Sequence, residues 1–266
     1  MTALPAVEKG QRHQMRIGQA WIDVLTFREG LDAIGNLVRA GRGGAVYTPN
    51  VDHIVMLDRN PKFREVYQRA ALSFADGVPV IWASHLLRPV LPEKVSGSDL
   101  MMPLMQLAGR EGWRVYLLGG STGAAKFAAE RLRRECNTNI VGIDDGIVRI
   151  GDKSPEQRAI VERIKAANPD IVLVALGAPK QEYWIDENAE ELSSTVLLGV
   201  GASVDFVAGT MRRSPKWMSN VGLEWLYRLG QEPKRLWRRY LIDDPVFVGI
   251  VMRTWRLPRS ERERWI

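Results

Sequence analysis

Short apolar runs alternate with longer amphipathic stretches between residues 43 and 201 of the chain. Each run is rich in Val, Ile, Leu or aromatic residues and stops at Gly, Asp or Asn. Near-continuous apolar runs of this length predict strands of a parallel sheet that is buried on both faces. The predicted strands lie within residues 43–50, 71–77, 113–120, 138–146, 169–177 and 194–201.

The stretches between these runs predict helices, of which the one at residues 154–169 is the clearest. Ser154 is suited to the N-cap position of this helix, and Pro155 is suited to its first helical position. Gln157, at the third helical position, would complete a capping box with Ser154. Strands that alternate with helices indicate an α/β fold, with a parallel sheet covered by helices on both faces. We assign residues 1–209 to this core and residues 210–266 to a helical basic appendage, and we expect the core to fold without the appendage.

Charge separates these two parts. Residues 1–209 contain 24 Lys and Arg against 25 Asp and Glu, a net charge of −1, whereas residues 210–266 contain 13 against 6, a net charge of +7. The appendage also holds five of the nine tryptophans. A basic segment rich in tryptophan predicts a partner that is anionic and partly apolar.

The chain shows no sign of export or of a membrane span. It has one cysteine, Cys136, and its N-terminus lacks the apolar core of a signal peptide, which favours a reducing cytoplasm. The longest candidate span, residues 245–252, has 8 residues, where a helical span needs about 20. If a membrane is involved, we expect the protein to lie on its surface.

Polar residues follow the ends of the predicted strands. Ligands of open α/β sheets bind beyond the carboxyl ends of the strands, so these residues are the candidates for a site. They are Thr48, Asn50, Asp76, Gly119, Gly120, Ser121, Asp144, Asp145, Lys180, Gln181 and Asp205.

Residues 117–126 form a glycine-rich turn between a strand and a helix, the arrangement that holds a phosphate on free backbone N–H groups. As a dinucleotide motif it fails at its first glycine, which is Leu118, although Asp144 follows at the distance of a ribose-binding acid. The turn favours a nucleoside diphosphate and leaves open both NAD(P) and a tight turn without a ligand.

Two further residues have both a structural and a functional interpretation. Asp76 precedes a predicted helix, where it serves either as an N-cap or, partly buried, as a general base. Lys180 lies in the first turn of a helix, where its charge opposes the helix dipole. It is therefore either an ordinary surface lysine or the neighbour of an anionic ligand.

Signals for a metal or for a nucleophile are weak. The three histidines are scattered, Cys136 has no partner cysteine, and the nucleophile-elbow and P-loop motifs are absent from the sequence. We therefore expect transfer chemistry without a metal or another cofactor.

Taken together, these motifs resemble the WecG/TagA/CpsF family of bacterial glycosyltransferases over most of the chain. The motifs that carry the resemblance are TPNVDHI (48–54), ADG (75–77), VSGSDL (95–100), VYLLGG (115–120), GAPKQE (177–182), GVGASVDFVAG (199–209), RRSPKW (212–217) and GLEWLYRL (222–229). The resemblance implies a Rossmann-like core, a UDP-sugar donor, inversion without a metal, and a polyprenyl-diphosphate-linked sugar as acceptor. It also implies action at the cytoplasmic face of the inner membrane.

The resemblance also implies roles for single residues. Asp76 would be the general base, with Thr48, Asn50, Lys94 and Gln181 around it. The donor would contact a set made of Gly119, Gly120, Ser121, Asp145, Gly177, Lys180, Gln181, Asp205, Arg228, Arg235 and Arg238, the three arginines closing over its diphosphate. The chain departs from the family pattern at Lys94, usually arginine, which loses bidentate geometry, and at Ile147, usually aromatic.

Two other functions compete with glycosyl transfer. An NAD(P)-dependent oxidoreductase or epimerase would use the glycine-rich turn and Asp144, but it leaves the basic appendage unexplained. A non-enzymatic module would bind a membrane or a nucleic acid through the appendage. A near-neutral core with one confined basic segment suits an anionic lipid surface better than nucleic acid.

The expected docking residues are Trp237, Arg239, Tyr240, Phe247, Trp255 and Arg256. The sequence leaves open the transferred sugar, the acceptor sugar and whether the chain forms a homo-oligomer.

Overall fold

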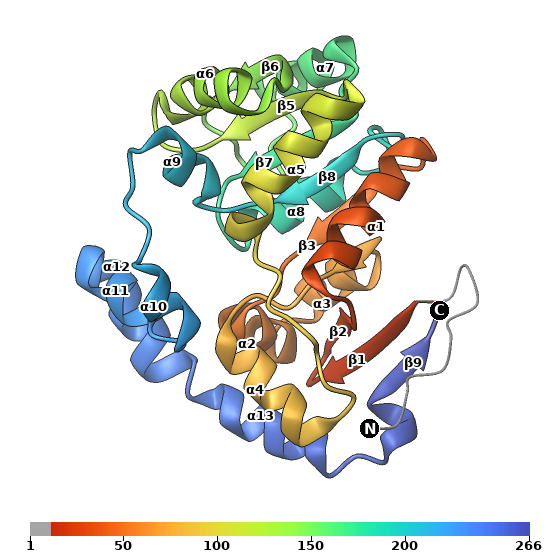
Figure 1. Ribbon diagram of the computed structural model, residues 1–266, viewed down its shortest axis with the longest axis vertical. Coiled ribbons are helices and arrows are strands. Elements are labelled where there is room, and N and C mark those ends of the chain that lie inside the picture. Colours follow the sequence, from red (N-terminus) through yellow and green to blue (C-terminus); the bar gives the residue numbers. More distant parts are fainter. Residues whose placement is uncertain (1–11) are drawn as a thin grey trace.

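The computed structural model describes residues 12–266, apart from the side chains of Lys216, Asn220, Arg235 and Arg239. Its centre is a six-stranded parallel sheet in the order β4-β3-β8-β7-β5-β6 (Figure 1). The strands are β3 (Gly44–Tyr47), β4 (Leu72–Ser73), β5 (Arg114–Gly119), β6 (Asn139–Asp144), β7 (Ile171–Ala175) and β8 (Val196–Gly199). All six fall within the runs predicted from the sequence, and every neighbouring pair is parallel.

Helices cover both faces of this sheet, as expected. One face carries α1 (Phe27–Arg39), α5 (Gly97–Glu111), α6 (Ala124–Cys136) and α9 (Ser203–Ala208). The other carries α2 (Val51–Arg59), α3 (Pro61–Gln68), α4 (Val78–Leu87), α7 (Pro155–Ala167) and α8 (Lys180–Asn188). Successive side chains of a strand point to opposite faces. Leu117 of β5 therefore packs on the face covered by α1, α5, α6 and α9, and Leu118 packs on the opposite face.

Helix α7 begins at Pro155 as predicted, but the predicted capping box is wrong. The Gln157 side chain donates from Nε2 to the Ile147 carbonyl and accepts from the Arg149 amide, both at 2.9 Å. Gln157 therefore fastens the loop before the helix to its first turn, and Ser154 makes no side-chain capping bond.

A second, antiparallel sheet joins the two ends of the described chain, in the order β2-β1-β9. It consists of β1 (His13–Ile17), β2 (Ala20–Asp23) and β9 (Glu263–Trp265). The sequence analysis did not anticipate this sheet. Strand β9 is only three residues long, too short for a periodic signal, and its pairing depends on β1 at the other end of the chain.

The C-terminal segment is mostly helical and has two parts. Its elements are α10 (Lys216–Asn220), α11 (Glu224–Gln231), α12 (Pro233–Arg238), a five-residue π-helix (Arg239–Asp243), α13 (Val246–Trp255), a 3₁₀ turn (Arg259–Glu261) and β9. Figure 1 shows α10 to α12 as a layer set apart from the main sheet. Helix α13 instead packs on α2, α4 and β1, and Phe247, Ile250 and Val251 are buried in the same cluster as Met15. Residues 246–266 are therefore integrated with the core, which corrects the expectation of a purely helical appendage from residue 210.

Candidate active site

The carboxyl ends of the six parallel strands meet at one edge of the main sheet, and their loops form the candidate site. Strands β5 and β7 are neighbours in the sheet. The connection after β5 runs to β6 at one edge of the sheet, and the connection after β7 runs to β8 in the opposite direction. A crevice is expected where neighbouring connections diverge in this way. There Gly120 donates its N–H to the Ala175 carbonyl at 2.8 Å, and Gly177 is the second residue after β7. A side chain on Gly119 would meet that same carbonyl oxygen at 2.6 Å, so this close approach requires glycine.

The glycine-rich turn after β5 is held by two carboxylates. Asp205, buried on α9, accepts hydrogen bonds from the Ser121 amide at 3.1 Å and from the Ser121 hydroxyl. Asp145 accepts from the Gly123 amide at 3.2 Å, immediately before α6. Of the predicted donor set, the structure thus brings together Gly119, Gly120, Ser121, Asp145 and Asp205 before α6.

Asp144 is directed away from this turn. It is buried, forms an ion pair with Arg163 on α7, and accepts a hydrogen bond from the Gly146 amide at 3.2 Å. A dinucleotide site would need this carboxylate on the ribose, but it already has a cationic partner. This arrangement weighs against the interpretation of the turn as an NAD(P) site.

Asn50, Gln181 and Thr48 lie at the middle of the sheet edge. Asn50 caps α2, accepting from the His53 amide at 3.2 Å, while its own amide donates to His53 Nδ1 at 3.3 Å. Gln181 is buried and accepts from the Gly201 amide at 3.0 Å, which joins the loops after β7 and β8. Thr48 is buried at the end of β3, whereas Lys180 is exposed at the start of α8.

Glu182 is a buried acid that the sequence analysis did not select. Its Oε1 accepts from Gln181 Nε2 at 2.8 Å and lies 3.8 Å from His53 Nε2. Burial raises the pKa of Glu182 to about 7, and the hydrogen bond from Gln181 offsets only part of that effect. Its position next to Gln181 in the GAPKQE motif was the only available signal.

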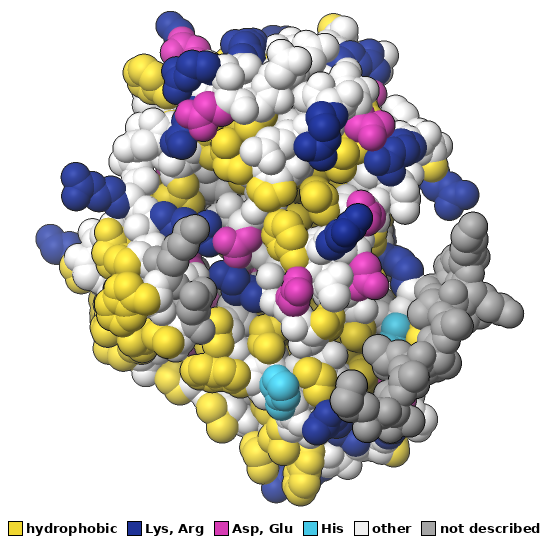
Figure 2. Space-filling view, in the orientation of Figure 1, with side chains coloured by type: hydrophobic (Ala, Val, Ile, Leu, Met, Phe, Trp, Pro, Cys, Tyr) yellow, Lys and Arg dark blue, Asp and Glu magenta, His cyan; other side chains and the backbone are white. Residues whose placement is uncertain are grey.

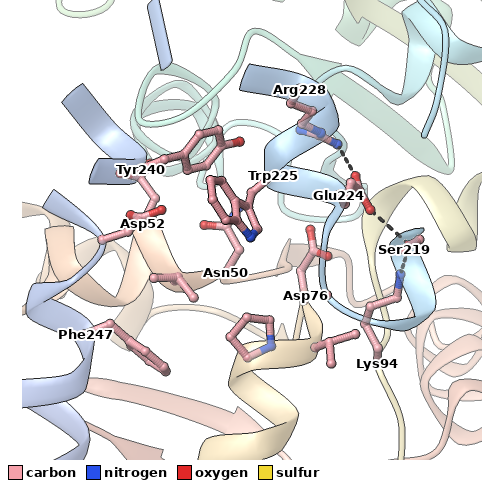
Figure 3. Close-up of a pocket in the computed structure, with 16 residues that line it drawn as sticks. Asn50, Asp52, Asp76, Lys94, Ser219, Glu224, Trp225, Arg228, Tyr240 and Phe247 are labelled. Atoms are coloured by element: carbon pink, nitrogen blue, oxygen red, sulfur yellow. Dashed lines mark hydrogen bonds and ion pairs between the residues drawn. The ribbon is translucent and has the colours of Figure 1, made fainter. Parts of the chain in front are cut away.

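A pocket of about 280 Å³ opens at the β3 and β4 end of this edge (Figure 3). The core provides one wall, and α10, α11, the π-helix and α13 provide the other. The lining residues are Asn50, Val51, Asp52, Asp76, Gly77, Val78, Pro79, Lys94, Ser219, Gly222, Glu224, Trp225, Arg228, Tyr240, Asp244 and Phe247. Of the predicted catalytic set, the pocket therefore unites Asp76, Asn50, Lys94 and Arg228, while Thr48 and Gln181 lie outside its lining.

Asp76 is not the N-cap of α4. Gly77, with φ +103°, occupies the cap position, and no side chain caps this helix. Asp76 is half-buried in the pocket, and its amide donates to the Pro49 carbonyl at 3.0 Å. Burial, followed by the nearby Glu224 carboxylate, raises the pKa of Asp76 to about 7 against the opposing charges of Lys94 and Arg228. A carboxyl group with this pKa is suited to accept a proton near neutral pH.

A chain of polar contacts links the core to α11 beside Asp76. Lys94 Nζ lies 2.9 Å from Asp99 Oδ2 and donates to Ser219 Oγ at 3.2 Å. Ser219 Oγ donates to Glu224 Oε2 at 3.1 Å, and Arg228 donates to Glu224 Oε1 at 2.7 Å (Figure 3). Asp99 also pairs with Arg213. The sequence analysis missed Ser219 and Glu224, although Glu224 lies inside the GLEWLYRL motif.

Arg228 lines the pocket and also lies against α9, the helix that carries Asp205. Its guanidinium carbon lies 5.6 Å from the ring centre of Phe206, which neighbours Asp205 on α9. Arg238 is exposed and does not line the pocket, and the side chain of Arg235 lies outside the described residues.

Two of the expected docking residues point inward. Phe247 is 8% exposed and Tyr240 is half-buried, and both line the pocket, so these two assignments are corrected. Trp237, Trp255 and Arg256 are exposed, and the side chain of Arg239 lies outside the described residues. The sequence could not separate the two groups because aromatic residues are found both in protein cores and at membrane surfaces.

The described residues contain neither a metal-ligating cluster nor a membrane-spanning helix. Within residues 12–266, no three His, Cys, Asp or Glu side chains converge in a way that could hold a metal ion. No helix in that range is both long and apolar enough to cross a bilayer.

The model of the WecG/TagA/CpsF glycosyl transferase family matches residues 15–261. The match covers nearly the whole chain, and the protein belongs to this family. Membership implies a glycosyltransferase of cell-surface polysaccharide assembly that uses a nucleotide-sugar donor and a lipid-linked acceptor. Glycosyl transfer is therefore favoured over the oxidoreductase and the non-enzymatic module considered from the sequence.

Proposed function

We propose that this glycosyltransferase moves one sugar, with inversion, from a UDP-sugar to a polyprenyl-diphosphate-linked saccharide at the cytoplasmic face of the inner membrane. The observation that carries the proposal is the position of Asp76. Its carboxyl group faces the pocket, caps no helix, and has a pKa raised to about 7. Arg228 of the C-terminal segment lines the same pocket.

The reaction is a single in-line displacement. The acceptor hydroxyl oxygen forms a bond to the anomeric carbon while Asp76 takes its proton. The bond between that carbon and the diphosphate oxygen breaks, and its electron pair leaves with UDP. Attack on the face opposite the leaving group inverts the anomeric centre. A positioned base of this kind contributes about 10²–10⁴-fold.

The donor lies along the sheet edge from the glycine-rich turn towards Asp76. The positive end of the α6 dipole suits a diphosphate, and Arg228 lines the pocket and also lies against Phe206, the neighbour of Asp205, which holds the turn. Arg228, with Arg235 and Arg238 following on α12, meets the negative charge that develops on the leaving diphosphate. We propose that these cations take the place of a metal.

Lys94 has a defined position in this scheme. It bridges Asp99 and Ser219 and thereby ties α5 to α10. An ammonium group donates to separate partners without the planar fork of arginine. Lys94 therefore fixes the wall that carries Arg228 and adds positive charge beside Asp76.

Membrane docking is the second part of the proposal. Trp237, Trp255 and Arg256 are exposed on the C-terminal segment, which carries the whole net positive charge of the chain. Tryptophan rings favour the headgroup region, and each basic residue near an anionic leaflet contributes about 1 kcal/mol. Docking would bring the pocket to a lipid-linked acceptor.

The decisive test is a panel of UDP-sugars incubated with polyprenyl-diphosphate-linked saccharides and read by mass spectrometry, with and without EDTA. We expect one UDP-sugar to extend the acceptor by a single sugar, at the same rate in EDTA. Failure of every UDP-sugar would refute the donor assignment, and loss of activity in EDTA that Mg²⁺ restores would refute metal independence.

A further inference from the structure

The pocket beside Asp76 has an aromatic wall supplied by the C-terminal segment. The rings of Trp225 and Tyr240 lie edge to face, with 5.8 Å between their centroids, and both line the pocket (Figure 3). Trp225 is 36% exposed, which leaves part of its ring available to a ligand. Aromatic faces pack well against the C–H surfaces of sugar rings, which are apolar.

The charged groups of this pocket offer hydrogen-bond acceptors to a ligand with many hydroxyls. Its described lining contains four carboxylates, those of Asp52, Asp76, Glu224 and Asp244. The described cations of the lining are Lys94 and Arg228, and each is already paired with a carboxylate. Carboxylate oxygens accept hydrogen bonds from the hydroxyl groups of a sugar.

A diphosphate has a separate place on the other side of Arg228. The glycine-rich turn lies beyond Phe206 and Asp205, at the N-terminus of α6. The amides of Gly120, Ser121 and Gly123 already donate to protein acceptors. The positive end of the helix dipole favours an anion beside them. Arg228 thus stands between a region that suits a diphosphate and a region that suits a saccharide.

Exposed apolar side chains adjoin the pocket at Gly222. A side chain on Gly222, which lines the pocket, would meet the Trp82 ring of α4 at 3.3 Å. Trp82 is 59% exposed, and Leu86 on the same helix and Trp217 and Val221 on α10 and its end are exposed too. Figure 2 shows hydrophobic side chains gathered over α10–α12 on the left of the view and again near its lower end. A ligand with a sugar and a lipid part finds both chemistries here.

We infer that the pocket walled by Trp225 and Tyr240 binds the saccharide of the lipid-linked acceptor, while the donor diphosphate lies beyond Arg228 at the glycine-rich turn. The inference rests on the proposed function and adds to it a separate location for each substrate. Asp76 then lies in the acceptor site, next to the hydroxyl group whose proton it takes. The C-terminal segment builds this site by carrying both aromatic rings.

The test uses Trp225→Ala with Trp225→Phe as the conservative variant. Phe127→Ala is the control, because Phe127 is an exposed aromatic residue of α6 that lies outside the pocket. The probes are water-soluble short-chain alkyl diphosphates that carry N-acetylglucosamine, N-acetylgalactosamine or glucose, and UDP. Binding of each to the full-length proteins is measured by calorimetry without a second substrate.

We expect Trp225→Ala to weaken binding of the preferred saccharide probe by about tenfold or more, the usual effect of removing a central aromatic contact. Trp225→Phe should cost less, and UDP affinity should stay within about twofold in all variants, because UDP binds beyond Arg228. In turnover assays, the acceptor KM should rise and the donor KM should not. Weaker UDP binding with unchanged probe binding would overturn the inference, as would a wild-type protein that binds none of the three probes.

This design separates the inference from the proposed function. If the wild-type protein binds a saccharide probe through Trp225 but transfers no sugar from any UDP-sugar, the donor assignment fails and the saccharide site stands. If it transfers sugar while Trp225→Ala leaves the acceptor KM unchanged, the function stands and the saccharide site fails.

Discussion

Arg228 donates a hydrogen bond to Glu224 across one turn of α11, with 2.7 Å between Arg228 Nη2 and Glu224 Oε1. The two side chains bring opposite charges to the same wall of the pocket, beside Asp76. The carboxylate of Glu224 raises the pKa of Asp76, and the guanidinium of Arg228 opposes that rise. One helix outside the sheet thus influences both the proposed base and the charge that faces the leaving group.

The first prediction concerns Asp76→Asn. The amide keeps the size of the side chain but cannot take a proton, so turnover should fall by about a hundredfold or more while UDP affinity is retained. Single-turnover kinetics and calorimetry measure the two quantities. The matched control is Asp58→Asn, which removes only a partly exposed ion pair with Arg253 and should leave turnover near the wild-type value. Near-normal turnover of Asp76→Asn would contradict its role as base.

The second prediction concerns the pH dependence of catalysis. The base must be deprotonated, so kcat/KM should rise with pH through the pKa of Asp76, about 7. In Glu224→Gln the neighbouring negative charge is removed, which lowers this pKa and shifts the rising limb to lower pH. The ratio of activity at pH 6 to activity at pH 8 should therefore increase, whatever the absolute rate. A limb that stays in place would show that Glu224 does not act on Asp76.

The third prediction concerns the pH dependence of stability. The pKa of buried Glu182 rises from 4.5 to about 7 on folding, so its protonated form is favoured in the native state. Its contribution to stability is complete below about pH 4.5 and is lost as the pH rises through about 7. Across this range the free energy of unfolding of the wild-type protein should fall by up to about 3 kcal/mol because Glu182 ionises. The side chain of Glu182→Gln cannot ionise, so the variant should not show this fall. Urea denaturation at pH 5 and pH 8 measures the difference, and parallel profiles of the two proteins would count against it.

The fourth prediction concerns α13. Ile250 is fully buried against the core, so Ile250→Ala should lower the free energy of unfolding by about 2–5 kcal/mol. Val248 on the same helix is 65% exposed, and Val248→Ala should change it by less than about 0.5 kcal/mol. Equal effects in denaturant titrations would contradict the packing of α13.

By the same reasoning, truncation after residue 209 should destabilise the core, contrary to the expectation from sequence.

The fifth prediction concerns membrane docking. The double variant Trp237→Ala, Trp255→Ala removes two exposed rings and should bind weakly to vesicles that contain phosphatidylglycerol. The wild-type protein should sediment with these vesicles, less so at high salt, and poorly with neutral phosphatidylcholine vesicles. Phe127→Ala, an exposed aromatic change on α6, should bind as the wild type does. Equal sedimentation of the double variant would refute the docking assignment.

The pattern of apolar and polar residues predicts the central sheet and its helices. All six strands fall within apolar runs, because a strand buried on both faces needs apolar residues at nearly every position. The sequence also predicts the glycine-rich turn and the start of α7. Glycine permits backbone conformations that other residues avoid, and proline fixes φ at a helix start. The family motifs named Asp76, Asn50, Lys94 and Arg228, which the structure unites in one pocket.

The partners of those residues, in contrast, depend on how the elements pack in three dimensions. The pairing of Asp144 with Arg163, the chain of contacts from Lys94 to Glu224, and the inward position of Phe247 all join segments that are distant in sequence or lie on different elements. The pairing of β9 with β1 likewise depends on both ends of the chain. Hydrophobic periodicity reports which face of an element is buried but not which element covers it, so the partners of a charged or aromatic side chain emerge only when the elements pack.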